Sequence, residues 1–230
     1  MIIAILLFVG LMALSLWASF RVKSVYNRYA REAVLTGLTG AAAAQRILDD
    51  SGVSGVAIEH QEGELIDHYD PHHRRLVLSD ANYFGTSISS VAVAAHEAGH
   101  AIQHARAYGP LHWRMAAVGA TTVASQVVMW LPLLGLFTGF VTGSTAMIIM
   151  AAGWGVIMLF NLVTLPVEFD ASQRAKRALY SCGVISGGAE ASGVEKVLNA
   201  AALTYVAAFI TSLAYFLWHL LPLLAGRGRE

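Results

Sequence analysis

The run His96-Glu97-Ala98-Gly99-His100 contains three side chains whose types and spacing could do metal chemistry. On a helix, two histidines four positions apart project from one face, one turn apart, and can bind a single tetrahedral ion. Glu97 follows the first histidine, beside the remaining coordination position, where a carboxylate can take the proton of a water that the ion makes acidic. The pattern predicts a zinc site formed by His96 and His100, with Glu97 as general base.

A third ligand is expected, because catalytic zinc has three protein ligands and one open position. Glu168 is the candidate. It follows Pro166, a residue that favours the start of a helix, and lies in the first turn of that expected helix. We therefore predict that a second helix supplies a carboxylate to the two histidines, although an acid at a helix start can also simply complement the helix dipole.

Other polar side chains could support such a site. Asp170 or Ser172 could orient a ligand by hydrogen bonding, although either is also compatible with a solvated polar residue. His104 continues the four-residue spacing, but it lies ~12 Å along a straight helix from His96, too far to share one ion. Candidates for stabilising the oxyanion of a hydrolytic reaction are His68, Tyr69 and Arg174.

The composition is that of a membrane protein. Hydrophobic residues make up 56% of the 230 residues and charged residues only 13%, whereas an ordinary soluble domain has roughly 25% charged residues. The formal net charge is zero, so no basic surface indicates a nucleic-acid partner. The single cysteine, Cys182, excludes a disulfide within the chain.

Several stretches are long and apolar enough to cross a bilayer as helices. Residues 115–167 contain no Asp, Glu, Lys, Arg or His, which is enough for a hairpin of two spans with a turn around residues 139–144. A cleaved signal peptide is the alternative for the first stretch, but no basic residue precedes it. The predicted spans are residues 1–20, 116–137, 145–166 and 198–225.

The basic residues predict how these spans are oriented. Nine Lys and Arg residues lie between the first and second spans, four lie between the third and fourth, and two follow the last. The positive-inside rule therefore places residues 21–114 and 168–197 in the cytoplasm and both termini outside. In this topology the candidate ligands lie on the same, cytoplasmic, face of the membrane.

The segment 21–114 combines helix and strand patterns. Residues 39–52 predict a short alanine-rich helix that ends at a glycine. Residues 56–60 and 64–68 alternate around a turn and residues 74–79 form a third predicted strand, which together indicate a small antiparallel sheet. Residues 74–79 could form an edge strand that holds an extended peptide, or the sheet could be purely structural.

Three segments of this chain resemble one known family. Residues 94–105, Asp67-His-Tyr-Asp-Pro71 and Leu165-Pro-Val-Glu-Phe-Asp-Ala-Ser172 are similar to the YugP family of bacterial membrane zinc metallopeptidases. More distantly, the order of parts resembles the HtpX and CAAX prenyl membrane proteases, whose third ligand is a Glu that opens an E-x-x-x-D pattern. Glu168 fits that opening, whereas Ser172 stands where the Asp would be. The resemblance implies a gluzincin-type zinc endopeptidase.

The combined prediction is a mainly α membrane protein with about four transmembrane helices and a small cytoplasmic, zincin-like α+β portion. Its partners would be a protein or peptide substrate and the lipid bilayer, and its cofactor one catalytic Zn²⁺ held by His96, His100 and Glu168. The alternative is a non-catalytic membrane scaffold that keeps zinc for stability or partner binding. Glu97 argues against that alternative, because a structural zinc site needs no base.

Overall fold

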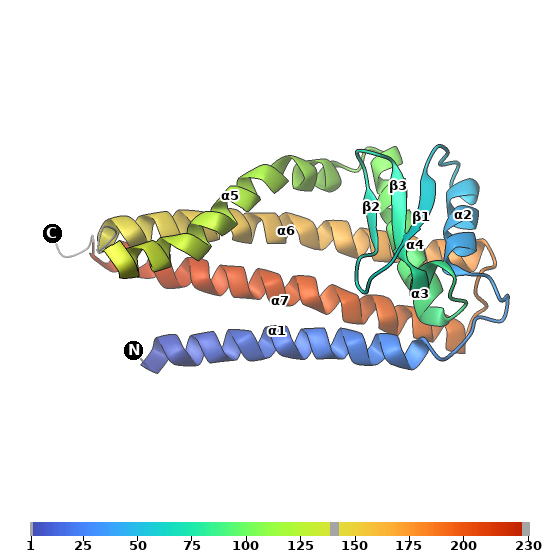
Figure 1. The fold of residues 1–230 in the computed structure, drawn as a ribbon, viewed down its shortest axis with the longest axis horizontal. Helices are drawn as coiled ribbons and strands as arrows, with labels where there is room; N and C mark the ends of the chain where they lie inside the picture. Colours follow the sequence, from blue (N-terminus) through green and yellow to red (C-terminus); the bar gives the residue numbers. More distant parts are fainter. Residues whose placement is uncertain (1, 139–142, 227–230) are drawn as a thin grey trace.

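The structure, a computed structural model, describes residues 2–138 and 143–226. Figure 1 shows long helices running along the longest axis, with a small sheet and shorter helices packed at one end. The first of the long helices begins, and the last ends, at the opposite end of the bundle. The long helices are α1 (Ile2–Tyr29), α5 (Gly109–Thr138), α6 (Ser144–Ser181) and α7 (Ala189–Gly226).

All four long helices could cross a membrane by length and composition. The mean hydropathy of their most apolar windows is 1.5 to 2.4, and only 6 to 22% of each window is buried inside the protein. So much exposed apolar surface requires an apolar surrounding. The prediction of a mainly helical protein with four apolar helices is confirmed, while residues 139–142 of the predicted turn lie outside the described part of the chain.

The prediction that a new helix begins at Pro166 is wrong, because α6 runs without interruption through this residue. A proline inside a helix removes one backbone hydrogen bond. Membrane helices tolerate this loss where neighbouring helices surround them, and α6 packs against α4, α5 and α7. Consequently Glu168 lies on the same continuous helix as the apolar part of α6.

Helix α4 (Ile88–Ala105) carries the histidine pair and is the central element of the polar end. Its first turn is capped by the hydroxyl of Ser87, which accepts from the backbone N–H of Ser90 at 3.1 Å. Alanine favours the helix intrinsically and adds little bulk. Four buried alanines therefore let α2, α6 and α7 pack closely around α4: Ala94, Ala95, Ala98 and Ala101.

Helix α2 (Gly40–Asp50) confirms the alanine-rich helix expected between residues 39 and 52. The Thr39 hydroxyl caps it by accepting from the backbone N–H of Ala42 at 3.2 Å. After its end, Gly52 adopts the left-handed conformation with φ 66° that glycine reaches without strain. Ile47 and Leu48 are fully buried in the core shared with α4.

The sheet contains three strands, as expected, but the second lies at residues 68–70 and not at 64–68, and the pairing also differs from the prediction. The strands are β1 (Ala57–Gln61), β2 (His68–Asp70) and β3 (Arg75–Ser79), in the spatial order β1-β3-β2. β3 is parallel to β1 and antiparallel to β2, so the sheet is mixed. The apolar run of β3 is buried whereas β1 is largely exposed, which favours β3 at the centre.

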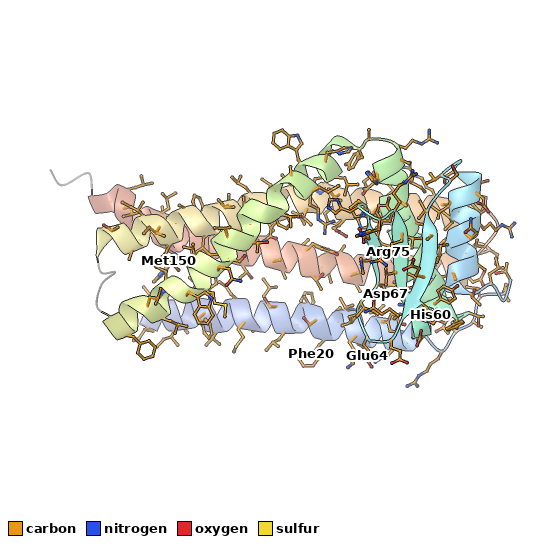
Figure 2. The ribbon with its side chains drawn as sticks, turned by 45° about the horizontal axis from the view of Figure 1, so that its top comes forward. Phe20, His60, Glu64, Asp67, Arg75 and Met150 are labelled. Carbon is orange, nitrogen blue, oxygen red and sulfur yellow. The ribbon has the colours of Figure 1, made fainter. Side chains whose placement is uncertain are left out.

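This order also shows that residues 74–79 do not form an edge strand, because β3 is paired on both sides. Asp67, just before β2, holds the end of β3 and the following short helix α3 (Asp80–Tyr83). Its carboxylate accepts from Ser79 N at 2.7 Å and from Asn82 Nδ2 at 2.9 Å. Figure 2 shows Asp67 at the sheet, far from Met150 at the other end of the bundle.

Candidate metal centre

Two helices bring together the three side chains that the sequence singled out as metal ligands. His96 and His100 extend from α4 and Glu168 from α6, and one nitrogen or oxygen of each lies within 4.8 Å of the others. Glu168 Oε2 is 3.1 Å from His96 Nε2 and 3.6 Å from His100 Nε2. Glu168 is 2% exposed and His100 7%. The three donor atoms therefore surround one small, largely buried volume.

The second nitrogen of each imidazole is held by a neighbouring side chain. Ser172 Oγ lies 3.1 Å from His96 Nδ1, and Gln103 Oε1 lies 3.0 Å from His100 Nδ1. The amide oxygen of Gln103 can only accept, so it fixes a proton on His100 Nδ1 and leaves Nε2 with its lone pair. Both rings therefore turn Nε2 toward Glu168, the orientation that metal binding through Nε2 requires.

Gln103 was not predicted from the sequence, although it lies one helical turn after His100 and on a neighbouring face. It is fully buried. Its amide nitrogen donates to Val167 O and to Asp170 Oδ2, both at 2.8 Å. Arg174 Nε in turn donates to Asp170 Oδ2 at 2.6 Å. Asp170 and Arg174 thus reach His100 through Gln103, not directly.

The electrostatic environment of His100 favours a positive charge at this position. Burial lowers the pKa of His100, but its contacts with Glu168 and the nearby carboxylate of Glu97 raise the pKa by more, so it lies above its ordinary value. The carboxylates of Glu97 and Glu168 would also stabilise a divalent cation at this position. Two imidazoles and one carboxylate form a donor set that suits zinc.

The distance between the two helices is set by Gly99, between the two histidines. A Cβ atom at Gly99 would lie 2.6 Å from Ala171 O, which is closer than real Cβ atoms approach. The backbones of α4 and α6 therefore touch at this position, which only glycine permits. This contact brings Glu168, three residues before Ala171, to the level of the histidines.

Comparisons with known proteins agree with this geometry. A family described as "Putative neutral zinc metallopeptidase" matches residues 4–224. This chain belongs to that zinc metallopeptidase family. It is also 44% identical over 231 residues to the "Putative membrane protease YugP" of Bacillus subtilis (strain 168), covering 98% of this chain and 99% of that protein. No solved structure matches the chain.

Arg114 is a further residue at the centre that sequence reasoning missed. Its Nη1 lies 3.1 Å from Glu168 Oε1. The pair is a close charge contact, not an aligned hydrogen bond, and within the described chain Oε1 has no aligned donor. Arg114 is therefore a counter-charge for the oxygen of Glu168 that faces away from the histidines. Its position beside the long apolar stretch was the only signal in the sequence.

Two tyrosines and one histidine lie farther from the three ligands. Tyr205 on α7, also missed, lies close enough to Glu168 and Glu97 for their charges to influence its hydroxyl. The hydroxyl of Tyr69 on β2 instead forms a hydrogen bond of 2.9 Å with His104 Nδ1. His68 is exposed, with Nδ1 2.6 Å from Ile66 O. Of the predicted oxyanion candidates, the structure therefore places Tyr69 and His68 along β2 and not against Glu168.

Proposed function

We propose that this membrane zinc metallopeptidase is an endopeptidase that cleaves protein or peptide substrates at the cytoplasmic membrane face. The observation that carries the proposal is the meeting of Glu168 with the histidine pair. The three come from two helices, 72 residues apart in the sequence between His96 and Glu168, yet their donor atoms fit around one ion. Three protein ligands leave one coordination position for water or substrate.

His96 and His100 would hold the ion through Nε2, and Glu168 through Oε2. Bound zinc supplies Lewis acidity, which polarises a peptide carbonyl and lowers the pKa of water to about 7. Ser172 and Gln103 keep the two imidazoles in the orientation that binding requires. Such a site hydrolyses the peptide directly and needs no covalent intermediate with the protein.

Glu97 is the group that would move the proton. It follows His96 on α4, is 8% exposed, and lies close enough to His100 to influence its charge. Its carboxylate would accept a proton from the attacking water and then donate it to the leaving amine. Tyr205, which is close enough to Glu97 and Glu168 to be influenced by their charges, is a new candidate for stabilising the developing oxyanion.

An extended substrate could lie along β2. This strand is at an edge of the sheet and packs beside α4. An unpaired strand edge binds an extended peptide through main-chain hydrogen bonds and is insensitive to much of the peptide's sequence. We therefore assign the role of peptide-binding edge strand, considered above for residues 74–79, to β2, because β3 lies at the centre of the sheet.

The cytoplasmic location is supported by charge and by shape. Most Lys and Arg residues lie in the two segments that contain the ligands, residues 21–114 and 168–197, as the positive-inside rule requires of a cytoplasmic face. The start of α1 and the end of α7 lie together at the far end of the bundle (Figure 1). Four crossings would leave both at the same, external, side.

Hydrolysis of casein by the purified protein in detergent tests the proposal. Cleavage should require zinc, stop with a chelator and return when zinc is restored. Glu97→Gln should lower kcat by at least about 100-fold while zinc stays bound, because only the base is lost. Glu62→Gln, in an exposed turn, is the matched control and should retain activity. Zinc-loaded protein that cleaves neither casein nor a peptide library, or an equally active Glu97→Gln variant, would favour the scaffold alternative.

A further inference from the structure

A cavity lies beside α4 at the end of this helix that follows the ligand pair. Its volume is about 230 Å³, and it is lined by Val53, Val56, Tyr69, Arg74, Ala101, His104 and Ala105. This volume is below that of drug-sized ligand sites, which is ~300–1,000 Å³, and suits a single side chain or chain end. Apolar walls and a few polar groups are the usual composition of a recognition pocket.

The polar groups of the cavity are one cation, Arg74, and two groups that can donate hydrogen bonds, Tyr69 and His104. Arg74 and His104 line it, and the ring of His112 on α5 lies 6.2 Å from that of His104. Burial is the main cause that lowers the pKa of His104, and His112, Arg74 and His72 add to it, so Arg74 is the charged side chain among the described residues that line the cavity. None of the described residues that line the cavity is acidic. An anion would therefore be attracted to this pocket.

Local contacts hold these groups in place. A hydrogen bond of 2.9 Å joins the Tyr69 hydroxyl and His104 Nδ1 and fixes the orientation of the ring. Arg74 Nη2 donates to Ser54 O at 3.0 Å, and a guanidinium with five N–H donors has others for a ligand. Arg74 also has a φ of 50°, a left-handed conformation that side-chain-bearing residues rarely adopt and that often occurs at functional positions.

The pocket and the metal centre share helix α4. His104 follows His100 by one helical turn, which is ~6 Å along the axis. Two residues of an extended peptide span ~6.6 Å. Tyr69 belongs to β2, the edge strand that we propose as the peptide track, and Figure 1 shows β2 running alongside α4. A peptide with its scissile bond at the metal would therefore place a residue about two positions away near Arg74 and His104.

We propose that this cavity is a specificity pocket that binds a substrate carboxylate, held by Arg74 and His104, about two residues from the cleaved bond. The inference rests on the proposed peptidase function and names a feature of its substrates. A carboxylate is the planar anion that a guanidinium binds through two parallel hydrogen bonds. It can come from an Asp or Glu side chain or from the end of a substrate chain.

Peptide cleavage by the full-length protein in detergent tests the pocket. A quenched fluorescent peptide with a fixed scissile bond is varied at each of the three positions on either side, with Glu compared with Gln. At one position Glu should raise kcat/KM about tenfold, and high salt should reduce this preference. Arg74→Gln should abolish the preference, so that the Glu and Gln peptides are cleaved with equal kcat/KM.

Arg106→Gln is the matched control. Arg106 also donates to a backbone carbonyl, Ser51 O at 3.2 Å, but it does not line the cavity, so its loss should leave the Glu preference intact. A second pair of peptides, with a free or an amidated C-terminus and Gln at every varied position, separates a terminal carboxylate from a side-chain carboxylate. Absence of any preference, or a preference that survives Arg74→Gln, overturns the proposal.

Binding to the Glu97→Gln variant separates this inference from the proposed function. Fluorescence anisotropy of the labelled Glu and Gln peptides requires no cleavage. The Glu peptide should bind about tenfold more tightly, and the double variant with Arg74→Gln should bind both equally. If the wild type cleaves no peptide but this difference is found, the peptidase proposal fails and the carboxylate pocket stands. Equal binding of both peptides to Glu97→Gln overturns the pocket.

Discussion

Ser172 and Gln103 hold the two imidazoles of the centre in different ways. Gln103 is itself fixed by Val167 O and Asp170, so His100 is oriented by a network. His96 has a hydroxyl, Ser172 Oγ, on its Nδ1. This difference makes His96 the ligand whose orientation a single small substitution can release.

Replacing Ser172 with alanine is therefore expected to weaken zinc binding. Loss of an outer hydrogen-bond partner typically costs 10–100-fold in metal affinity, and we expect a value toward the lower end, about tenfold, because one contact is removed. Competition with a chromophoric chelator measures the affinity. Ser181→Ala, at an exposed serine of the same helix, should leave it unchanged. An unaltered affinity in Ser172→Ala would show that Ser172 does not orient His96.

Arg114 and zinc should act as alternative counter-charges for Glu168. In the metal-free protein, Arg114→Gln removes a cation from a carboxylate that is 2% exposed, so the free energy of unfolding should fall. We expect about 1–2 kcal/mol, because Arg114 is 30% exposed and water screens part of the interaction. Thermal unfolding in detergent, followed by circular dichroism, measures the change.

Zinc should reduce the difference in the free energy of unfolding between Arg114→Gln and the wild type, because the bound ion replaces the lost positive charge. Arg177→Gln, at an exposed position of α6, provides the control and should unfold like the wild type with or without zinc. A stability gap that zinc leaves unchanged would mean that Arg114 does not act through Glu168.

At the level of single residues, regular spacing was predictable and partners from other elements were not. The four-residue period of a helix was enough to pair His96 with His100. Glu168 could be proposed because an even number of membrane crossings returns the chain to the same face. The contact of Arg114 with Glu168 depends on the packing of α5 against α6. No local pattern in the sequence encodes this packing.

At the level of elements, the centre depends on the close contact between α4 and α6. Gly99 lies where the two backbones touch, so Gly99→Ala should push the helices apart. Overpacking of this kind costs about 1–3 kcal/mol, and zinc affinity should fall because Glu168 moves away from the histidines. The measurements are thermal unfolding and chelator competition. Gly119→Ala, where an added Cβ meets nothing within 4 Å, should change neither, and a zinc affinity in Gly99→Ala equal to the wild type would contradict this role.

The presence of strands and helices was easier to predict than the pairing of the strands and the residues at which the helices begin and end. The alternation and turn residues indicated three strands, but β3 lies between β1 and β2 because its apolar run gains most from burial on both sides. Similarly, Pro166 suggested a helix start in isolation. Packing of α6 against three other helices outweighs that local preference, and the helix continues to Ser181.

At the level of the whole molecule, the metal centre lies at the end of the bundle opposite the start of α1. Cysteine labelling in oriented vesicles tests which side of the membrane this end occupies. In a Cys182→Ser background, a cysteine introduced by Glu62→Cys, in an exposed turn, should react with an impermeant thiol reagent only from the cytoplasmic side. Labelling from the external side would reverse the proposed topology.

The central claim is that His96, His100 and Glu168 bind one zinc ion together. The most direct measurement is the zinc content of the purified full-length protein and of the variants His96→Ala, His100→Ala and Glu168→Ala, by mass spectrometry of the metal after dialysis. We predict one zinc per wild-type chain and a large loss in each variant. A wild type without zinc, or Glu168→Ala with full zinc content, would contradict the account.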